Sequence, residues 1–233
     1  MSRLIKVLRP PNILDYKTGL TLQQKISAQP ANNVTSFTNY LLLLEHHPVY
    51  TIGIRTKGYT DKDENYLKSL GADFCKTNRG GLITFHGPGQ LVAYPVLHLK
   101  LFKPSMRWYV AQLESTVIDL CKSMGIPNAQ TTSDTGIWVG HNKICAIGVH
   151  GSQYITTHGI GLNCNTDLEW FNHIVPCGIE NKGVTSLTKE LKRNISIDKA
   201  IPHLLDAFCR NFDCKFEWDD RDLIKENNDG FTL

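Results

Sequence analysis

Cys177 is the residue of this chain whose setting best suits nucleophilic chemistry. It lies between Pro176 and Gly178. The proline restricts the backbone and the glycine has no side chain, so a carbonyl carbon could reach an exposed sulfur there. The same surroundings also suit an ordinary cysteine in a turn. Cys177 alone is therefore compatible with both a nucleophile and a turn residue.

Lys143 is a candidate activator for such a thiol. It opens an otherwise apolar strand pattern, residues 144–149, and a lysine at a strand edge is usually just solvated. However, a free thiol has a pKa of about 8.5 and is only a few per cent thiolate at neutral pH. A neighbouring ammonium lowers that pKa, and each unit corresponds to about 1.4 kcal/mol. Lys143 would activate Cys177 if the two side chains met, which the sequence alone does not determine.

A glycine-rich segment, residues 79–90, has the sequence RGGLITFHGPGQ. Glycine weakens a strand but lets the backbone approach a ligand closely or bend sharply. The segment could therefore direct Arg79 and His86 toward one place, or it could simply flank a hairpin strand with two tight turns. The phosphate-binding patterns GxGxxG and GxxxxGK[ST] are absent from it, which weakens a nucleotide-binding interpretation.

Three histidines offer a competing way to activate the thiol. His86 lies in the glycine-rich segment, His158 precedes Gly159, and His173 lies shortly before Cys177. A Cys/His pair could form with any of them. The histidines could equally hydrogen-bond the backbone and hold the loops in place. Both roles stay open.

The composition indicates a folded domain without metal or disulfide chemistry. The chain has 233 residues, of which 41% are apolar and 20% charged, with a net charge of +3. This charge is too small to indicate a nucleic-acid or membrane partner, and no run of 18 apolar residues is present. The seven cysteines are scattered, without CxxC spacing, which favours a reducing compartment. We expect neither a metal nor a cofactor.

Hairpins dominate the predicted secondary structure. Apolar periodicity predicts helices over residues 12–28 and 198–211, and one after Pro104 with Ser105 as its N-cap. Two apolar runs between residues 136 and 149 flank a short turn and predict a β-hairpin. Further strands are predicted over residues 40–44, 49–54, 74–77, 82–85, 91–97, 154–165 and 214–218. Because few strands alternate with helices, we expect one α/β (α+β) domain over residues 1–233, with a mixed, largely antiparallel sheet and packed helices.

The basic N-terminus has two interpretations. Residues 1–9 contain three basic side chains, and the first acidic one is Asp15. A mitochondrial presequence can begin in this way, but a first β-strand fits at least as well.

Taken together and in order, these segments resemble the lipoyl(octanoyl)transferase family, in its animal mitochondrial form. The motifs that carry the resemblance are RGGxxTFHGPGQ at residues 79–90 and IxPCG at residues 174–178. The hairpin at residues 136–148 and the segment HGIGLN at residues 158–163 lie between them. The resemblance implies the fold of the catalytic domain of biotin and lipoate protein ligases.

The resemblance also implies an activity, the transfer of an octanoyl group from acyl carrier protein to a lysine of a lipoyl domain, as the first step of protein lipoylation. It implies that Cys177 carries the acyl group as a thioester, that Lys143 lowers the pKa of the thiol, and that no cofactor is needed. The implied acceptors are subunits of 2-oxoacid dehydrogenases and the glycine cleavage H protein. The implied location is the mitochondrion, or the cytoplasm if the chain is bacterial. The implied acyl pocket consists of Arg79, Gly80, Gly81, Leu82, Ile83, Thr84, Phe85, His86, Ala146, Ile147, Gly148, Gly159, Ile160 and Gly161.

Three other functions remain compatible with the sequence. An ATP-dependent lipoate ligase would use the same fold and form an adenylate without a cysteine. A cysteine hydrolase would use a Cys/His pair. A non-catalytic module would bind lipoyl domains only.

Overall fold

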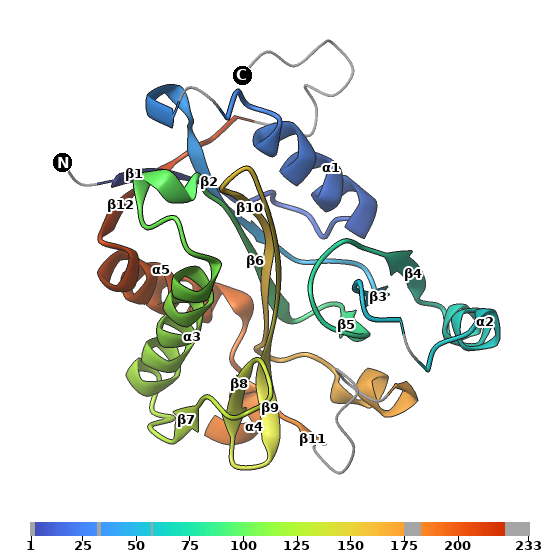
Figure 1. Cartoon of the computed structure of the whole chain (residues 1–233). Helices are drawn as coiled ribbons and strands as arrows, with labels where there is room; N and C mark the ends of the chain where they lie inside the picture. Colours follow the sequence, from blue (N-terminus) through green and yellow to red (C-terminus); the bar gives the residue numbers. More distant parts are fainter. Residues whose placement is uncertain (1–2, 32–33, 57, 175–182, 222–233) are drawn as a thin grey trace.

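The main sheet is the frame on which the other elements pack. The structure is a computed structural model that describes residues 3–31, 34–56, 58–174 and 183–221. The strands lie in the order β12-β1-β2-β6-β10-β9-β8-β7, and β11 pairs with β9 (Figure 1). Only the β1–β2, β1–β12 and β9–β11 pairs among these are parallel. The predicted fold class, mixed and largely antiparallel, is therefore confirmed. The bounds are β1 (Arg3–Leu8), β2 (Asn39–Leu44), β6 (Gln90–Val96), β7 (Ala129–Gln130), β8 (Ile137–Val139), β9 (Asn142–Ser152), β10 (Ile155–Asn163), β11 (Gly183–Val184) and β12 (Cys214–Trp218).

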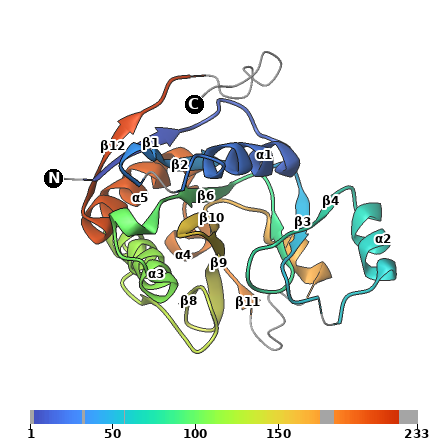
Figure 2. The same ribbon diagram turned by 45° about the horizontal axis from the view of Figure 1, so that its top comes forward.

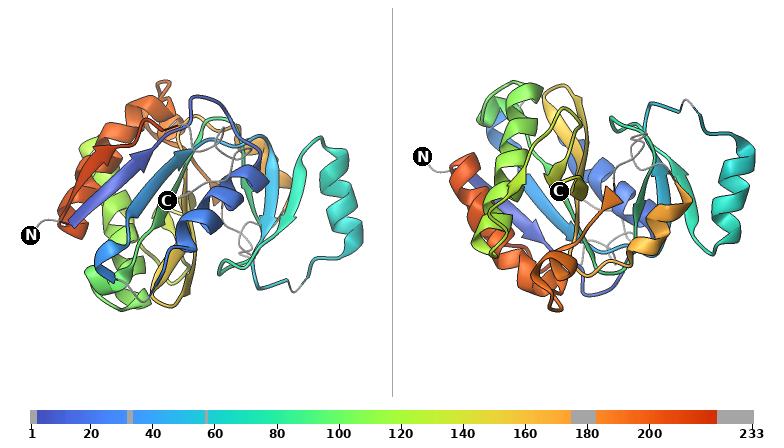
Figure 3. Two further views of the ribbon diagram at one scale, coloured as in Figure 1. Left: turned by 90° about the horizontal axis from the view of Figure 1, so that it is seen from above. Right: turned by 90° about the horizontal axis from the view of Figure 1, so that it is seen from below.

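Helices cover both faces of this sheet. α3 (Met106–Ser123) and α5 (Ile197–Phe212) lie on one face, and α1 (Tyr16–Ser27) lies on the other (Figure 3). Side chains alternate across a strand, so the continuous apolar run of β6 serves both cores. Leu91 belongs to the α3/α5 core and Val92 to the α1 core. The sheet is thus buried on both sides.

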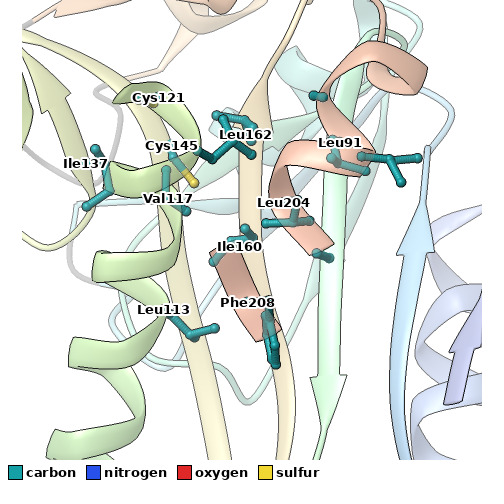
Figure 4. Close-up of a cluster of buried hydrophobic side chains, with 14 of the residues drawn as sticks. Leu91, Leu113, Val117, Cys121, Ile137, Cys145, Ile160, Leu162, Leu204 and Phe208 are labelled. Atoms are coloured by element: carbon teal, nitrogen blue, oxygen red, sulfur yellow. The ribbon is translucent and has the colours of Figure 1, made fainter. Parts of the chain in front are cut away.

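The α3/α5 core holds the strands that carry the candidate site. Ile160 and Leu162 of β10 lie among side chains of α3 and α5, including Val117 and Phe208 (Figure 4). Full burial of one such side chain contributes about 1.5–3 kcal/mol. This packing fixes one face of β10, so the opposite face of β10 is presented at a defined position.

A second, smaller sheet lies beside the main one. Its strands are β3 (Val49–Ile52), β4 (Asp73–Lys76) and β5 (Thr84–His86), in the order β4-β3-β5. The helix α2 (Asp61–Ser69) lies next to β4 (Figure 2). Residues 87–89 lead from β5 directly into β6 of the main sheet. The glycine-rich segment therefore joins the two sheets.

Strong local signals were predicted well. The Oγ atom of Ser105 accepts a hydrogen bond from the backbone N–H of Trp108 at 3.3 Å and caps α3, as expected. The hairpin β8–β9 forms around Gly140, where the predicted turn lies. The basic N-terminus forms a β-strand, one of its two interpretations, because residues 3–8 form β1.

Two helices were missed by the apolar periodicity. α2 buries only Leu67 among its described residues, so its sequence lacks an apolar stripe. Its start is marked instead by a cap, in which the Thr60 backbone N–H donates to the Asp63 carboxylate at 2.7 Å. The other missed helix, α4 (Leu187–Leu191), is too short to show a period.

Short 3-10 helices occur at Val34–Ser36, Leu99–Leu101 and Leu168–His173. In the part of the chain that the structure describes, no helix has the length and apolar character needed to cross a membrane.

Candidate active site

A cavity of about 180 Å³ opens between the glycine-rich segment and strands β9 and β10. Three segments far apart in the sequence meet there, all of which the sequence analysis had selected. The described residues that line it are Tyr16, Arg55, Arg79, Gly81, Leu82, Thr84, His86, Tyr94, Ser133, Asp134, Thr135, Ala146, Ile147, Gly148, His158, Gly159, Ile160 and Gly161.

The run from Leu82 to His86 lines the cavity with alternate residues only. Leu82, Thr84 and His86 face it, as the period of a strand requires. Ile83 and Phe85 belong instead to the core of the second sheet. Gly80 is likewise absent from the lining, and its N–H donates to the Val149 carbonyl at 3.0 Å. Of the predicted run from Arg79 to His86, the residues that line the cavity are Arg79, Gly81, Leu82, Thr84 and His86.

Strand pairing aligns the other two segments of the wall. In the antiparallel β9–β10 pair, Ala146 lies opposite Gly161, and Gly148 lies opposite Gly159. A Cβ on Gly159 would collide with the carbonyl oxygen of Ala93 in β6. A Cβ on Gly148 would come within 3.0 Å of Arg79 Cδ. These glycines therefore make room for neighbouring protein atoms in the cavity wall.

Arg79 holds the glycine-rich segment against the second sheet. Its Nη2 donates to the carbonyl oxygen of Thr51 at 2.6 Å and to the Thr51 hydroxyl at 2.9 Å. Its Nη1 donates to the Gly80 carbonyl at 3.0 Å. Arg79 was predicted to bind substrate. The structure places it in the cavity wall with its guanidinium bonded to these protein groups.

One end of the cavity is lined by two buried histidines and two tyrosines, and His46 packs against them from outside the lining. His46 Nδ1 donates to the Leu14 carbonyl at 3.0 Å, so its Nε2 accepts from the Tyr94 hydroxyl at 3.1 Å. His158 Nε2 lies 2.8 Å from Asn78 Oδ1. The ring of Tyr16 stacks on His86 with centroids 5.8 Å apart. The sequence analysis missed both tyrosines, since neither Tyr16 nor Tyr94 lies in a glycine-rich context that signals a site.

These histidines are uncharged at neutral pH. Burial lowers the pKa of His46 to about 4 and that of His86 to about 3. Burial, together with the positive charge of Arg79, lowers the pKa of His158 to about 4. A neutral imidazole is compatible with an apolar ligand, whereas an imidazolium is not. The cavity thus offers apolar surface despite its three histidine neighbours.

The lowered pKa values predict a pH-dependent stability. Between pH 6.5 and about 4 the unfolded chain binds protons at these three histidines, whereas the folded chain does not, so the free energy of unfolding falls as pH falls. Three histidines give a slope of up to about 4 kcal/mol per pH unit. Denaturant unfolding between pH 6 and 5, above the titration of most carboxylates, measures it. The variant His158→Asn should lose about a third of the slope, and an unchanged free energy across this range would contradict the buried, neutral state.

A directed hydrogen-bond chain connects the cavity with Thr185, the residue after β11. Asn163 Nδ2 donates to the Thr185 carbonyl at 3.0 Å, and Asn163 Oδ1 accepts from Gln90 Nε2 at 2.9 Å. Gln90 Oε1 then accepts from His86 Nδ1 at 2.7 Å. Because Thr185 offers a carbonyl that can only accept, each donor along the chain is fixed. His86 therefore carries its proton on Nδ1.

Lys143 lies buried at the other end of the cavity. A small adjoining pocket is lined by Lys143 and shares Thr84, Ala146 and Gly161 with the main cavity. Lys143 is 5% exposed, and its Nζ lies 4.8 Å from the centroid of the Trp138 ring. Among the described residues, this Nζ has no hydrogen-bond partner. The lysine is thus not the solvated strand-edge residue that its type suggests.

Gly136 makes space for the Lys143 side chain. Its φ of +116° is a conformation that glycine adopts readily. A Cβ at this position would come within 3.3 Å of Lys143 Cδ and Cε. The same Cβ would come within 2.6 Å of the Cys145 carbonyl oxygen, so both the backbone of β9 and the lysine stem favour glycine at the position before β8.

Cys177 lies outside the described residues, which resume at Gly183. The segments on each side of this gap can be placed. Phe171 and Val184 line the same small pocket as Lys143, and Gly183 pairs with Asn142 next to Lys143. His173, one of the candidate bases, lies elsewhere, with its Nδ1 2.9 Å from the hydroxyl of exposed Tyr66.

The arrangement of these segments agrees with comparisons to known proteins. Residues 15–209 match the lipoyl protein ligase A/B catalytic domain. The chain belongs to this family. The resemblance noted in the sequence is thereby confirmed.

Members of known activity are close in sequence. The mitochondrial octanoyl-[acyl-carrier-protein]:protein N-octanoyltransferase of Danio rerio is 58% identical over 201 residues, which cover 86% of this chain and 89% of that one. The enzyme of the same name from Xenopus tropicalis is 61% identical over 168 residues, covering 72% and 70%. Among solved structures, lipoate-protein ligase A bound with ATP matches with a TM-score of 0.69 at 16% identity, covering 97% of this chain and 92% of that one. At this identity the likeness concerns the fold alone.

Proposed function

We propose that this chain is an octanoyltransferase that carries the octanoyl group as a thioester on Cys177. The donor is octanoyl-acyl carrier protein, and the acceptor is a lysine of a lipoyl domain. The octanoyltransferases to which the chain is similar support the reaction. The single observation that supports the cysteine mechanism is the buried Nζ of Lys143, in a small pocket beside the main cavity and without a hydrogen-bond partner among the described residues.

A buried ammonium without an anionic or hydrogen-bonding partner is costly, because it has lost its hydration. A thiolate beside it would offset this cost, and the ammonium would in turn lower the pKa of the thiol. Cys177 follows Ile174 by three residues in the chain, so their Cα atoms lie at most about 11 Å apart. Ile174 packs in the same cluster as Phe171, which lines the Lys143 pocket. The chain connectivity therefore allows Cys177 to reach Lys143.

The other six cysteines lack such activation. Burial raises the pKa of Cys121 and Cys164 to about 12, and it raises that of Cys145 well above its usual value. Burial also raises the pKa of the remaining three, Cys75, Cys209 and Cys214. These thiols stay protonated and are poor nucleophiles. They serve as small apolar residues, as their scattered positions suggested.

The transfer proceeds in two balanced steps. The Cys177 thiolate attacks the carbonyl carbon of the donor thioester, and the phosphopantetheine thiolate of the carrier protein leaves. The neutral amine of the acceptor lysine then attacks the new thioester, and the Cys177 thiolate leaves as an amide forms. Exchange between thioesters is nearly even in free energy, and amide formation is favourable. The reaction therefore needs no nucleotide.

A proton must leave the acceptor lysine, whose unperturbed pKa is about 10.4. His86 and His158 are poor acceptors for it, because their pKa values are lowered to about 3 and about 4. Lys143 remains the better candidate, because its ammonium gives a proton to the departing phosphopantetheine thiolate in the first step and so enters the second step as a neutral amine that can accept one. The variant Lys143→Arg keeps a cation but accepts a proton poorly. If this variant kept both the Cys177 thiolate and the full rate of deacylation, Lys143 would not be the proton acceptor.

The main cavity is the acyl site in this proposal. Burying about six methylenes at ~0.8 kcal/mol each contributes roughly 5 kcal/mol to binding. The histidines at the far end are uncharged, so they do not offset the free energy gained by burying the acyl chain. Exposed Arg55, Ser133 and Thr135 lie at the mouth of the cavity, where solvent reaches.

Filling the junction of the two pockets should block the octanoyl chain. Ala146 lines both pockets, so Ala146→Leu is expected to slow acylation by octanoyl carrier protein at least tenfold. Acetyl carrier protein, which places almost no chain in the cavity, is the matched control and should be affected much less. A variant equally slow with both donors would contradict the assignment of the cavity.

The proposed function is tested by incubating the chain with octanoyl carrier protein and a lipoyl domain, without nucleotide. We expect octanoylated lipoyl domain as the product. Turnover only with free octanoate and ATP would instead identify a ligase, and release of mainly free octanoate would identify a hydrolase.

The related enzymes named above are mitochondrial, and we extend that location to this chain. Imaging of a tagged full-length chain checks it.

A further inference from the structure

A second cavity lies on the far side of His158 from the acyl site. Its volume is about 250 Å³, and α1, Asn78 and the hairpin of β9 and β10 form its walls. Among the described residues, His158 alone lines both this cavity and the acyl site. The imidazole therefore separates the second cavity from the acyl site.

Several contacts hold His158 in place. His158 Nε2 lies 2.8 Å from Asn78 Oδ1, and Nδ1 lies 3.5 Å from the Tyr16 hydroxyl. The backbone N–H of His158 donates to Gln23 Oε1 at 2.6 Å. Tyr16 lines the acyl site and Asn78 lines the second cavity, so the imidazole has a contact on each side. His158 is only 1% exposed.

The backbone of His158 is unusual. Its φ is +58°, in the left-handed region, which a residue with a Cβ adopts only at a cost in free energy. Glycine would adopt it without that cost, and Gly159 directly follows. A histidine kept in this conformation points to a requirement for its side chain.

The position of His158 matches the end of an octanoyl chain. Gly161, at the Lys143 end of the site, lies three positions further along β10, a span of roughly 10 Å. An extended chain advances about 1.2 Å per bond, as the polypeptide backbone does, so the seven C–C bonds of an octanoyl group span roughly 9 Å. An acyl group that begins near Gly161 therefore brings its last carbons to the imidazole.

We propose that His158 sets the chain length of the acyl substrate by closing the acyl site against the second cavity. This inference rests on the proposed octanoyl transfer. A dodecanoyl chain, four carbons longer, would have to pass the imidazole and break its contacts with Asn78 and Tyr16. Removal of the imidazole joins the two cavities and admits that longer chain.

The test compares dodecanoyl and octanoyl carrier protein as donors, with the acylated lipoyl domain measured by mass. His158→Gly suits the left-handed backbone, so the strand can keep its conformation. We expect the dodecanoyl-to-octanoyl ratio of kcat/KM to rise at least tenfold. His158→Asn, whose shorter side chain also tolerates this backbone, should give a smaller rise of at least threefold, and it decides the question if His158→Gly does not fold.

A blocking variant provides the matched control. Ser27 lines the second cavity but not the acyl site, so Ser27→Trp should fill the second cavity. Added to His158→Gly, it should return the ratio to within threefold of the wild-type value. An unchanged ratio in His158→Gly, or a gain that Ser27→Trp leaves in place, would overturn the inference. A wild-type chain that transfers no octanoyl group would instead refute the proposed function, so the two failures are distinguishable.

Discussion

Replacing Cys177 with alanine is expected to lower the rate of octanoyl transfer to a lipoyl domain by at least about 10⁴-fold, the scale on which loss of a catalytic nucleophile acts. Both steps pass through the Cys177 sulfur, and no other thiol can replace it. The described cysteines have raised pKa values because they are buried. The measurement is the rate of appearance of octanoylated lipoyl domain by mass spectrometry.

The control is Cys209→Ala. Cys209 is half-buried in α5, and burial raises its pKa. This change also removes a thiol, and it should leave the rate within twofold of wild type. A Cys177→Ala variant that kept more than a tenth of the rate would instead favour a ligase or a module that only binds lipoyl domains.

Replacing Lys143 with methionine should lower the rate at neutral pH by about 25-fold. This value follows if the ammonium lowers the pKa of the thiol by about two units from about 8.5, because the thiolate fraction at pH 7 then falls from about three quarters to about 3% when the ammonium is removed. The active form is the thiolate, so the pH–rate profile of the variant should move to higher pH, and raising the pH should recover much of the lost rate. Rates of acylation measured between pH 6 and 10 test this shift.

The stability of the same variant separates a catalytic role from a structural one. Methionine fills a similar volume under the Trp138 ring and removes a buried charge, which is neutral or stabilising in comparable cases. The midpoint of thermal unfolding should therefore stay or rise while the rate falls. A lower rate accompanied by lost stability and an unmoved pH profile would contradict the activation of Cys177 by Lys143.

Local signals in the sequence predicted most of the frame that positions the site. The turn at Gly140 lies between two apolar runs, and the cap at Ser105 precedes a long apolar period, so the β8–β9 hairpin and α3 were expected. Each depends on residues near one another in the chain. The helix α2 has no apolar stripe and depends on its cap and on packing against β4, so periodicity did not predict it.

The candidate site was predictable only where the chain carries a motif. The glycine-rich segment and residues 146–148 and 159–161 were expected to meet, and they line one cavity. Tyr16 reaches that cavity from α1, 142 positions before His158, which it approaches. No local pattern encodes a contact over such a separation. The burial of Lys143 beneath Trp138 was likewise not readable from a lysine at a strand edge.

The intact mass of the chain after incubation with octanoyl carrier protein, without nucleotide or acceptor, tests most directly whether Cys177 carries the acyl group. The mass should increase by one octanoyl group in place of one hydrogen, and hydroxylamine, which cleaves thioesters, should reverse the increase at neutral pH. Cys177→Ser should show no hydroxylamine-sensitive adduct. An unmodified wild-type chain that still transfers octanoyl to a lipoyl domain, or a hydroxylamine-sensitive adduct that persists in Cys177→Ser, would contradict the thioester mechanism.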